Sequence, residues 1–373
     1  MSQYSTLYVG LDVHKDTIVI AAVGNGDEQA VVDLGTISTR HYAIDKLLKK
    51  LQGMASELRL VYEAGPTGYW LQRLIETKGH RCQIISPSLL PKAAGDRVKT
   101  DRRDARSLAM ALKMGAVDGI HIPTVGDEAI RDVSRAWQQA RVDARKTKQR
   151  IKMFLLRHDV RYTGQARWSA PHRRWLSEQR MSNPASQIVL QELIETLGQH
   201  ERRSERLEKT LKDIVHDWRF GPVVQALQAF RGIQFLTALT MIAELGDLNR
   251  FDHPKKLMAY VGLVPGERSS GQTRKLGPIT RCGNSHVRTL LVESAWSYHY
   301  SPKVSRQISQ RQEGIDPDIL EIAWEAQTRL HRRYMKLKSR GMHQNKVITA
   351  VARELIGFIW AAAQQVPLAP EAA

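Results

Sequence analysis

The spacing of apolar residues changes along the chain, and this change limits most strongly what the chain can fold into. Over residues 1–125, short runs rich in β-branched residues alternate with amphipathic stretches, whereas long helical patterns dominate from about residue 126 onwards. A strand repeats its environment every two residues and a helix every 3.6, so the two parts need different elements. The sequence therefore predicts an α/β domain followed by all-α regions.

The first part has the order of elements expected of a mixed sheet. Strand patterns cover residues 7–13, 17–23, 58–62 and 82–86, and amphipathic helical patterns cover residues 42–51 and 69–78. Strands joined by a short turn form an antiparallel hairpin, while strands separated by a helix usually run parallel. This order favours an RNase-H-like sheet over a uniformly parallel one, in a domain that spans residues 1–125.

Two long helical patterns, residues 129–157 and 184–218, make up most of the region 126–222. The second pattern has one apolar stripe, with charged residues elsewhere. Such a stripe fits a coiled coil, formed within the chain or between chains, and it fits equally well a helical hairpin packed on its own domain. The sequence therefore predicts a helical and basic region that fits either arrangement.

Residues 223–366 are predicted to form a third, helical domain. Near its start, Gly232 lies between two helical patterns and resembles the turn of a helix-hairpin-helix element, whose backbone N–H groups can bind a phosphate. A loop is predicted over residues 264–283 and a helix over residues 285–300. The last residues, 367–373, are predicted to be disordered.

The chain is strongly basic, since 56 Lys and Arg residues against 38 Asp and Glu residues give a formal net charge of +18. Basic residues concentrate in residues 131–180, 268–288 and 329–340. A field of this size favours a polyanion, and nucleic acid is the leading partner. No uninterrupted apolar run approaches the roughly 18 residues that span a bilayer, and the first residues lack the order of a signal peptide. We therefore expect a cytoplasmic protein without a membrane partner.

Four carboxylates lie at positions where an acidic side chain requires a structural or functional explanation. Asp12 lies within an apolar strand pattern, where an uncompensated charge is costly. Glu63 directly follows a strand pattern and precedes a break rich in glycine and proline. Asp101 and Asp104 follow the candidate N-cap Thr100, and their spacing of three puts both on one helical face. Four acids from three elements can therefore converge on one site.

Oxygen ligands of this kind suit Mg²⁺ or Mn²⁺, and two such ions about 4 Å apart would clamp the attacking and leaving oxygens of a phosphodiester. The sequence therefore predicts metal-assisted phosphodiester chemistry. A carboxylate cluster would repel DNA unless cations lie beside it. We expect this role for the basic residues interleaved with the acids: Arg97, Lys99, Arg102, Arg103 and Arg106.

Four motifs resemble those of the DEDD transposases of bacterial insertion sequences, the Piv/MooV relatives. They are GLDVHK at residues 10–15, YEAGPTG at 62–68, KTDRRDA at 99–105 and SSG at 269–271, and the resemblance covers nearly the whole chain. It implies a RuvC-like domain whose metal site consists of the four acids named above. It also implies a C-terminal transposase domain in which a serine just before a glycine attacks DNA and forms a covalent phosphoserine link.

The position before Gly271 assigns the role of nucleophile to Ser270, with the adjacent Ser269 as the rival. A covalent ester would divide strand exchange into two steps and keep the phosphodiester energy for rejoining. Three basic residues near the serine are expected to steady the charge on the reacting phosphate: Arg268, Arg274 and Lys275.

The resemblance further implies a guide RNA, encoded by the same element, that selects donor and target DNA. The basic central region would then hold this RNA. It also implies dimers of dimers, in which the serine of one subunit completes the metal site of another. The predicted activity is DNA strand cleavage and exchange that moves an insertion sequence.

Three other classes of protein share part of this pattern. A RuvC-like nuclease for DNA junctions, which hydrolyses with the acids alone and forms no covalent intermediate, is the nearest alternative. An actin-like sugar or acetate kinase would need a second glycine-rich phosphate loop, and it would not explain the net charge of +18. An architectural DNA-binding protein would explain that charge but not the four acids.

Overall fold

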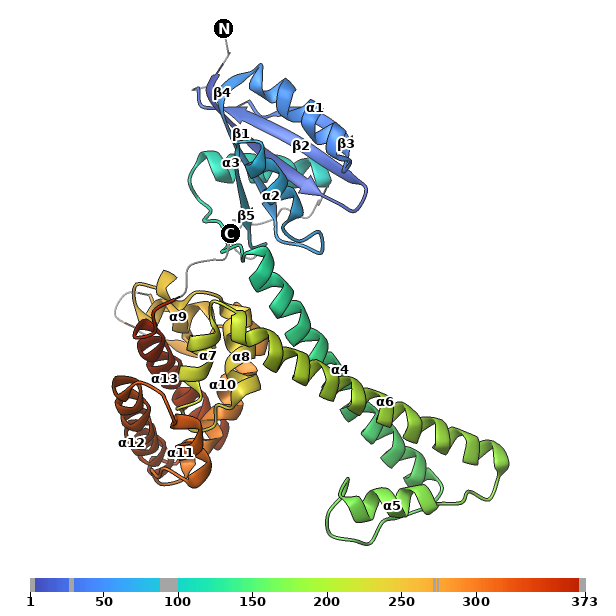
Figure 1. Ribbon diagram of the computed structural model, residues 1–373. Helices are drawn as coiled ribbons and strands as arrows, with labels where there is room; N and C mark the ends of the chain where they lie inside the picture. Colours follow the sequence, from blue (N-terminus) through green and yellow to red (C-terminus); the bar gives the residue numbers. More distant parts are fainter. Residues whose placement is uncertain (1–3, 27–29, 88–99, 271–272, 274, 369–373) are drawn as a thin grey trace. The chain divides into compact units, whose positions relative to one another are not determined.

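The computed structural model describes residues 4–26, 30–87, 100–270, 273 and 275–368 (Figure 1). The chain divides into two compact units, Met1–Ile122 and Pro123–Ala373. Each unit has its own hydrophobic core. The predicted combination of an α/β part with a mostly helical remainder is confirmed. The boundary predicted near residue 222 falls inside the second unit and stays a prediction.

A five-stranded sheet in the order β3-β2-β1-β4-β5 forms the centre of the first unit. Its strands are β1 (Tyr4–Val13), β2 (Thr17–Gly24), β3 (Val32–Ser38), β4 (Ala55–Glu63) and β5 (Arg81–Ile85). β2 pairs antiparallel with β1 and β3, whereas β4 pairs in parallel with β1 and β5. This mixed sheet is consistent with an RNase-H-like domain. The sequence does not predict the edge strand β3, because Gly35 and its half-buried or exposed side chains give no apolar alternation.

Helices cover both faces of the sheet (Figure 1). They are α1 (His41–Gln52), α2 (Trp70–Thr77) and α3 (Asp101–Lys113). α1 and α2 pack on one face, where Leu11, Ile44 and Leu71 belong to one buried cluster. α3 packs on the other face, where Val61 and Leu108 are buried together. The three helices therefore leave the sheet a two-sided core.

Two long helices dominate the start of the second unit (Figure 1). They are α4 (Val125–Arg157) and α6 (Pro184–Ile214), with the shorter α5 (Ala170–Glu178) between them in sequence. One residue from each helix, namely Ile151, Leu176 and Leu190, is buried in a shared cluster. The two long patterns thus form a helical hairpin within the chain, and a coiled coil between chains stays a prediction.

Shorter elements complete the second unit. They are η1 (Val215–Asp217), α7 (Gly221–Leu227), α8 (Phe235–Leu245), η2 (Leu248–Arg250), α9 (Pro254–Tyr260), β6 (Pro265–Glu267), β7 (Leu276–Ile279), α10 (Ser285–Ala295), η3 (Trp296–His299), α11 (Arg306–Gln312), α12 (Pro317–Ser339) and α13 (Gln344–Gln364). β6 and β7 pair antiparallel within the stretch predicted as a loop. Disorder is predicted from residue 367, but Leu368 packs against the core, and residues 369–373 lie outside the described residues.

α13 is long and apolar enough, by length and composition alone, to cross a membrane. The sequence predicts no such helix, because it has no uninterrupted apolar run of roughly 18 residues. Half of its most apolar window is buried inside the protein, and Val347, Val351 and Leu355 are fully buried. α13 therefore packs as a core helix of the second unit.

The turn between α7 and α8 requires a glycine, as the predicted hairpin element does. Gly232 has a φ of 80°, in the left-handed region that favours glycine. A methyl group added there would lie 2.6 Å from the carbonyl oxygen of Ser294 in α10. The turn therefore packs closely against α10. Phosphate binding by this turn stays a prediction.

We predict that Gly10→Ala loosens the first unit. A methyl group at Gly10 would lie 2.1 Å from the carbonyl oxygen of Ala105 and 2.6 Å from the backbone nitrogen of Ala109, both in α3. Overpacking of this kind lowers the free energy of unfolding by about 1–3 kcal/mol. Hydrogen exchange of β1 and α3 peptides should accelerate. Gly26→Ala, whose methyl group would have no heavy atom of the described residues within 4 Å, should leave it unchanged. Equal exchange in both variants would contradict the close packing.

A second prediction concerns acid stability of the helical hairpin. Glu201 of α6 accepts hydrogen bonds from Arg173 of α5 at 2.8 Å and pairs with Lys148 of α4 at 2.7 Å. The Arg173 hydrogen bonds, opposed by burial and aided by Lys148, lower the pKa of Glu201 from 4.5 to about 2. Because the folded pKa is depressed, the stabilisation is present above pH 4.5 and is lost as the pH falls toward 2.

Thermal unfolding followed by circular dichroism between pH 6 and pH 3 tests this. The wild type should lose more stability below pH 4.5 than Glu201→Gln does. Glu192→Gln is the matched control, because Glu192 is exposed on the same helix and forms no ion pair with the described residues. Parallel pH profiles for the wild type and Glu201→Gln would show that the three-helix junction contributes nothing.

Candidate active site

Two of the four predicted acids end adjacent parallel strands. Asp12 is the next-to-last residue of β1, and Glu63 is the last residue of β4. The register pairs Leu11 with Tyr62, and both side chains are buried in the cluster beneath α1 and α2. Because side chains alternate along a strand, Asp12 and Glu63 lie on the other face of the sheet, which α3 covers.

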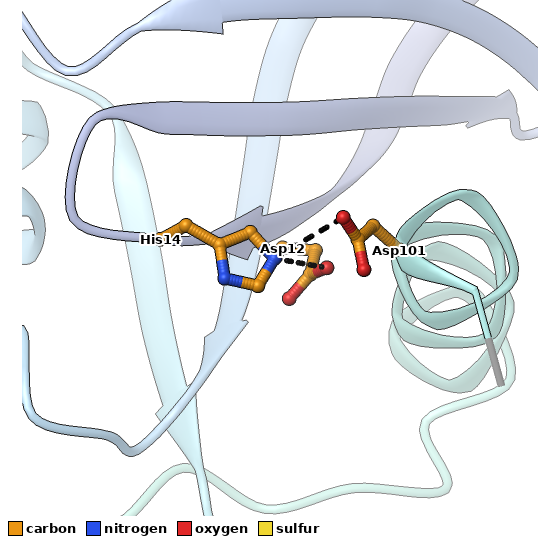
Figure 2. Close-up of side chains that lie close together, drawn as sticks. All are labelled: Asp12, His14 and Asp101. Carbon is orange, nitrogen blue, oxygen red and sulfur yellow. Dashed lines mark hydrogen bonds and ion pairs between the residues drawn. The ribbon is translucent and has the colours of Figure 1, made fainter.

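The other two acids lie in the first turn of α3. Thr100 is the N-cap, as predicted, and its side chain accepts a hydrogen bond from the backbone N–H of Arg103 at 3.4 Å. The N-terminal end of a helix favours negative charge, so this turn suits carboxylates. Asp101 points from the helix toward Asp12 on the strand (Figure 2). The helix and the sheet therefore present carboxylates to each other.

His14 completes a cluster with Asp12 and Asp101. Its Nε2 atom lies 3.1 Å from Oδ2 of Asp12 and 3.4 Å from Oδ2 of Asp101 (Figure 2). One ligand atom from each of the three residues lies within 4.8 Å of the other two. Sequence reasoning gives His14 no role, although its spacing of two from the strand acid is a signal that would have found it.

Negative charge in this cluster is only partly compensated. Burial has the largest effect on the pKa of Asp12 and raises it, His14 lowers it, and the nearby Asp101 and Asp104 raise it, so that the pKa lies above its ordinary value. A divalent cation would offset this mutual repulsion, and carboxylate oxygens are the ligands that such hard cations prefer. The residues present therefore fit a divalent metal.

Glu63 and Asp104 lie outside the 4.8 Å group found among the described residues. Glu63 nevertheless stands on the neighbouring strand end, and Asp104 is near enough to influence the charge on Asp12. The structure thus brings Asp12 and Asp101 together directly. It places the other two acids on the same face beside them.

The basic residues predicted to accompany the acids have different surroundings. Arg106 forms two hydrogen bonds, of 2.6 and 2.7 Å, with the carboxylate of Asp33 on β3. Arg102 and Arg103 are exposed at the start of α3. Arg97 and Lys99 lie outside the described residues. Contact of these residues with phosphates stays a prediction, and Arg106 would first have to leave its carboxylate partner.

The two candidate serines lie in the second unit, on the stretch that joins β6 to β7. Ser269 donates a hydrogen bond from its hydroxyl to Oε1 of Glu267 at 2.7 Å. Ser270 exchanges two backbone hydrogen bonds with Thr273, of 3.2 and 3.1 Å, and its side chain is exposed. Arg268 donates its backbone N–H to the carbonyl oxygen of Lys275 at 2.9 Å. Arg274 lies outside the described residues.

Comparisons with known proteins agree with these observations. Residues 9–158 match a transposase family model for the DEDD proteins of IS110 elements, and residues 224–309 match the model described as Transposase IS116/IS110/IS902 family. The chain is 42% identical over 365 residues to y4qE of Sinorhizobium fredii, named as a candidate transposase, which covers 98% of this chain and 90% of that protein.

A more distant relative is also matched over most of its length. The transposase for insertion sequence element IS1533 of Leptospira borgpetersenii is 28% identical over 340 residues, which cover 89% of this chain and 96% of that protein. Both family models therefore match within this one chain. The chain belongs to the DEDD transposases of the IS110 family.

Proposed function

We propose that the four acids hold the divalent metal that the DEDD family implies, Mg²⁺ or Mn²⁺, and that this site acts in the transposition of an insertion sequence. A metal bound there would polarise a DNA phosphodiester and stabilise the charge that develops on its oxygens. The supporting observation is the close placement of Asp12 and Asp101 with a raised pKa on Asp12. The protein's part is to hold these carboxylates on a rigid strand end and a capped helix.

Ser270 is the proposed nucleophile of strand cleavage. Its Oγ would form a bond to a DNA phosphorus while the P–O bond to a deoxyribose breaks, and the departing oxygen would end as a hydroxyl after taking up a proton. Its exposed side chain, on a hairpin whose base bears Arg268 and Lys275, supports this role. The rival Ser269 is less suited, because its hydroxyl is engaged by Glu267.

The partners follow from the same proposal. Donor and target DNA are the substrates, and a guide RNA would bind the basic residues 131–180, which include most of α4 and α5. The protein would act in the cytoplasm at the nucleoid as a dimer of dimers. The serine of one subunit would then meet the metal site of another. The α7–α8 turn at Gly232 would contact a DNA phosphate.

A suicide DNA substrate, nicked so that the cleaved piece diffuses away, tests the nucleophile. With Mg²⁺ and the guide RNA, we expect the wild type and Ser269→Ala to form a covalent protein–DNA adduct. Ser270→Ala should form none, because its side chain has no oxygen to bond to phosphorus. An adduct that survives Ser270→Ala would contradict the assignment. Cleavage without any adduct would instead favour a RuvC-like nuclease.

Substitution of the strand acid tests the metal site. Asp12→Asn keeps the shape of the side chain but removes the charge that holds the metal, so strand cleavage should fall by roughly 10²–10³-fold. DNA binding, measured by gel shift, should persist. Asp45→Asn, on α1 at the opposite face of the sheet, is the matched control and should cleave normally. Full cleavage by Asp12→Asn would show that Asp12 is not part of the metal site.

A further inference from the structure

An open groove lies between the β6–β7 hairpin and one side of α13 in the second unit. Its volume is about 620 Å³, and its apolar lining includes Pro265, Leu276 and Pro278. This volume suits a ligand of one or two nucleotides and is too small for a duplex. Leu276 is 56% exposed although it is a large apolar residue, so it offers a surface for a partner to cover.

Three cations line this groove. Lys346 and Arg353 lie seven residues apart on α13, which is close to two helical turns, so they share one side of the helix. Arg281 reaches the groove from the segment after β7. Among the described residues, no acidic residue lines the groove, and none forms an ion pair with any of the three cations. Unpaired charge of one sign in a concave wall attracts an anion.

The backbone of Arg281 has an unfavourable conformation, which its surroundings hold in place. Its φ of 57° lies in the left-handed region, which a non-glycine residue occupies only when its surroundings require it. Its N–H donates to the carbonyl oxygen of Gly262 at 3.1 Å, and a methyl group at Gly262 would lie 2.2 Å from the carbonyl oxygen of Cys282. This contact fixes the segment that presents the guanidinium to the groove.

We propose that the groove binds one or two nucleotides of unpaired nucleic acid. The phosphates would meet Arg281, Lys346 and Arg353, and a base would pack on Leu276 and the neighbouring prolines. Phosphate contacts supply affinity, and apolar packing against base faces tolerates any sequence. The choice of nucleic acid rests on the proposed function, because the hairpin that forms one wall also carries Ser270. An unpaired DNA strand beside the cleaved bond and an unpaired stretch of guide RNA share this chemistry.

Photocrosslinking with the full-length protein tests the proposal. The probes are eight-nucleotide single strands with a central 4-thiothymidine (DNA) or 4-thiouridine (RNA), and a duplex that contains the DNA strand. Mass spectrometry should place crosslinks from at least one single strand on peptides that contain Leu276 or Lys346. The preferred strand identifies the source. Neutralising the three cations together, as Arg281→Gln, Lys346→Gln and Arg353→Gln, should lower the yield there at least tenfold.

A charge-matched variant separates a specific groove from general attraction. Lys46→Gln, Lys49→Gln and Lys50→Gln together remove the same charge from α1 in the first unit and should leave the groove crosslinks unchanged. Leu276→Glu replaces an exposed side chain without disturbing the core, and it should also reduce them. Crosslinks elsewhere only, equal loss in the matched variant, or equal yield with the duplex would overturn the proposal. A missing serine adduct alongside intact groove crosslinks would instead count against the proposed nucleophile.

Discussion

The close contact between α3 and β1 is the constraint on which the candidate metal site depends. Gly10 has no side chain, and the helix facing it is built there from Ala105 and Ala109, so the helix backbone lies directly against the strand. This contact fixes the first turn of α3 at the carboxyl end of β1, where Asp101 and Asp12 both lie beside Nε2 of His14. Metal ligands must be held within about 0.5 Å of their working geometry. A larger residue in place of Gly10 would clash with the backbone of α3 and disturb that geometry.

In the second unit, a buried carboxylate with several hydrogen-bond donors holds separate elements together. The carboxylate of Glu244 in α8 is almost wholly buried, yet it accepts two hydrogen bonds from Arg135 of α4 and one from Asn284. Burial raises the pKa of Glu244, but these donors outweigh it and hold the pKa below its ordinary value. Since Asn284 also caps α10, directly after the segment that bears the serines, one buried acid ties the helical hairpin to that segment.

Much of this arrangement could be predicted from the sequence, because it rests on local patterns. Asp12 stands out within an apolar strand, and Thr100 marks the start of α3 by its capping chemistry. The rest depends on contacts between distant parts of the chain. β3 follows no apolar alternation and exists through its pairing with β2. The hydrogen bond from Ser269 to Glu267 favours Ser270 as the proposed nucleophile. It depends on the short β6–β7 hairpin, which the sequence predicts as a loop.

The central claim is that the carboxylates on this face of the sheet bind a divalent metal, and anomalous diffraction from crystals containing Mn²⁺ tests it most directly. We predict an anomalous peak about 2 Å from carboxylate oxygens of both Asp12 and Asp101, with further ligands from the other two acids. Its occupancy should fall in crystals of Asp12→Asn. Full Mn²⁺ occupancy at another position, with the His14 contacts to Asp12 and Asp101 unchanged, would contradict the account.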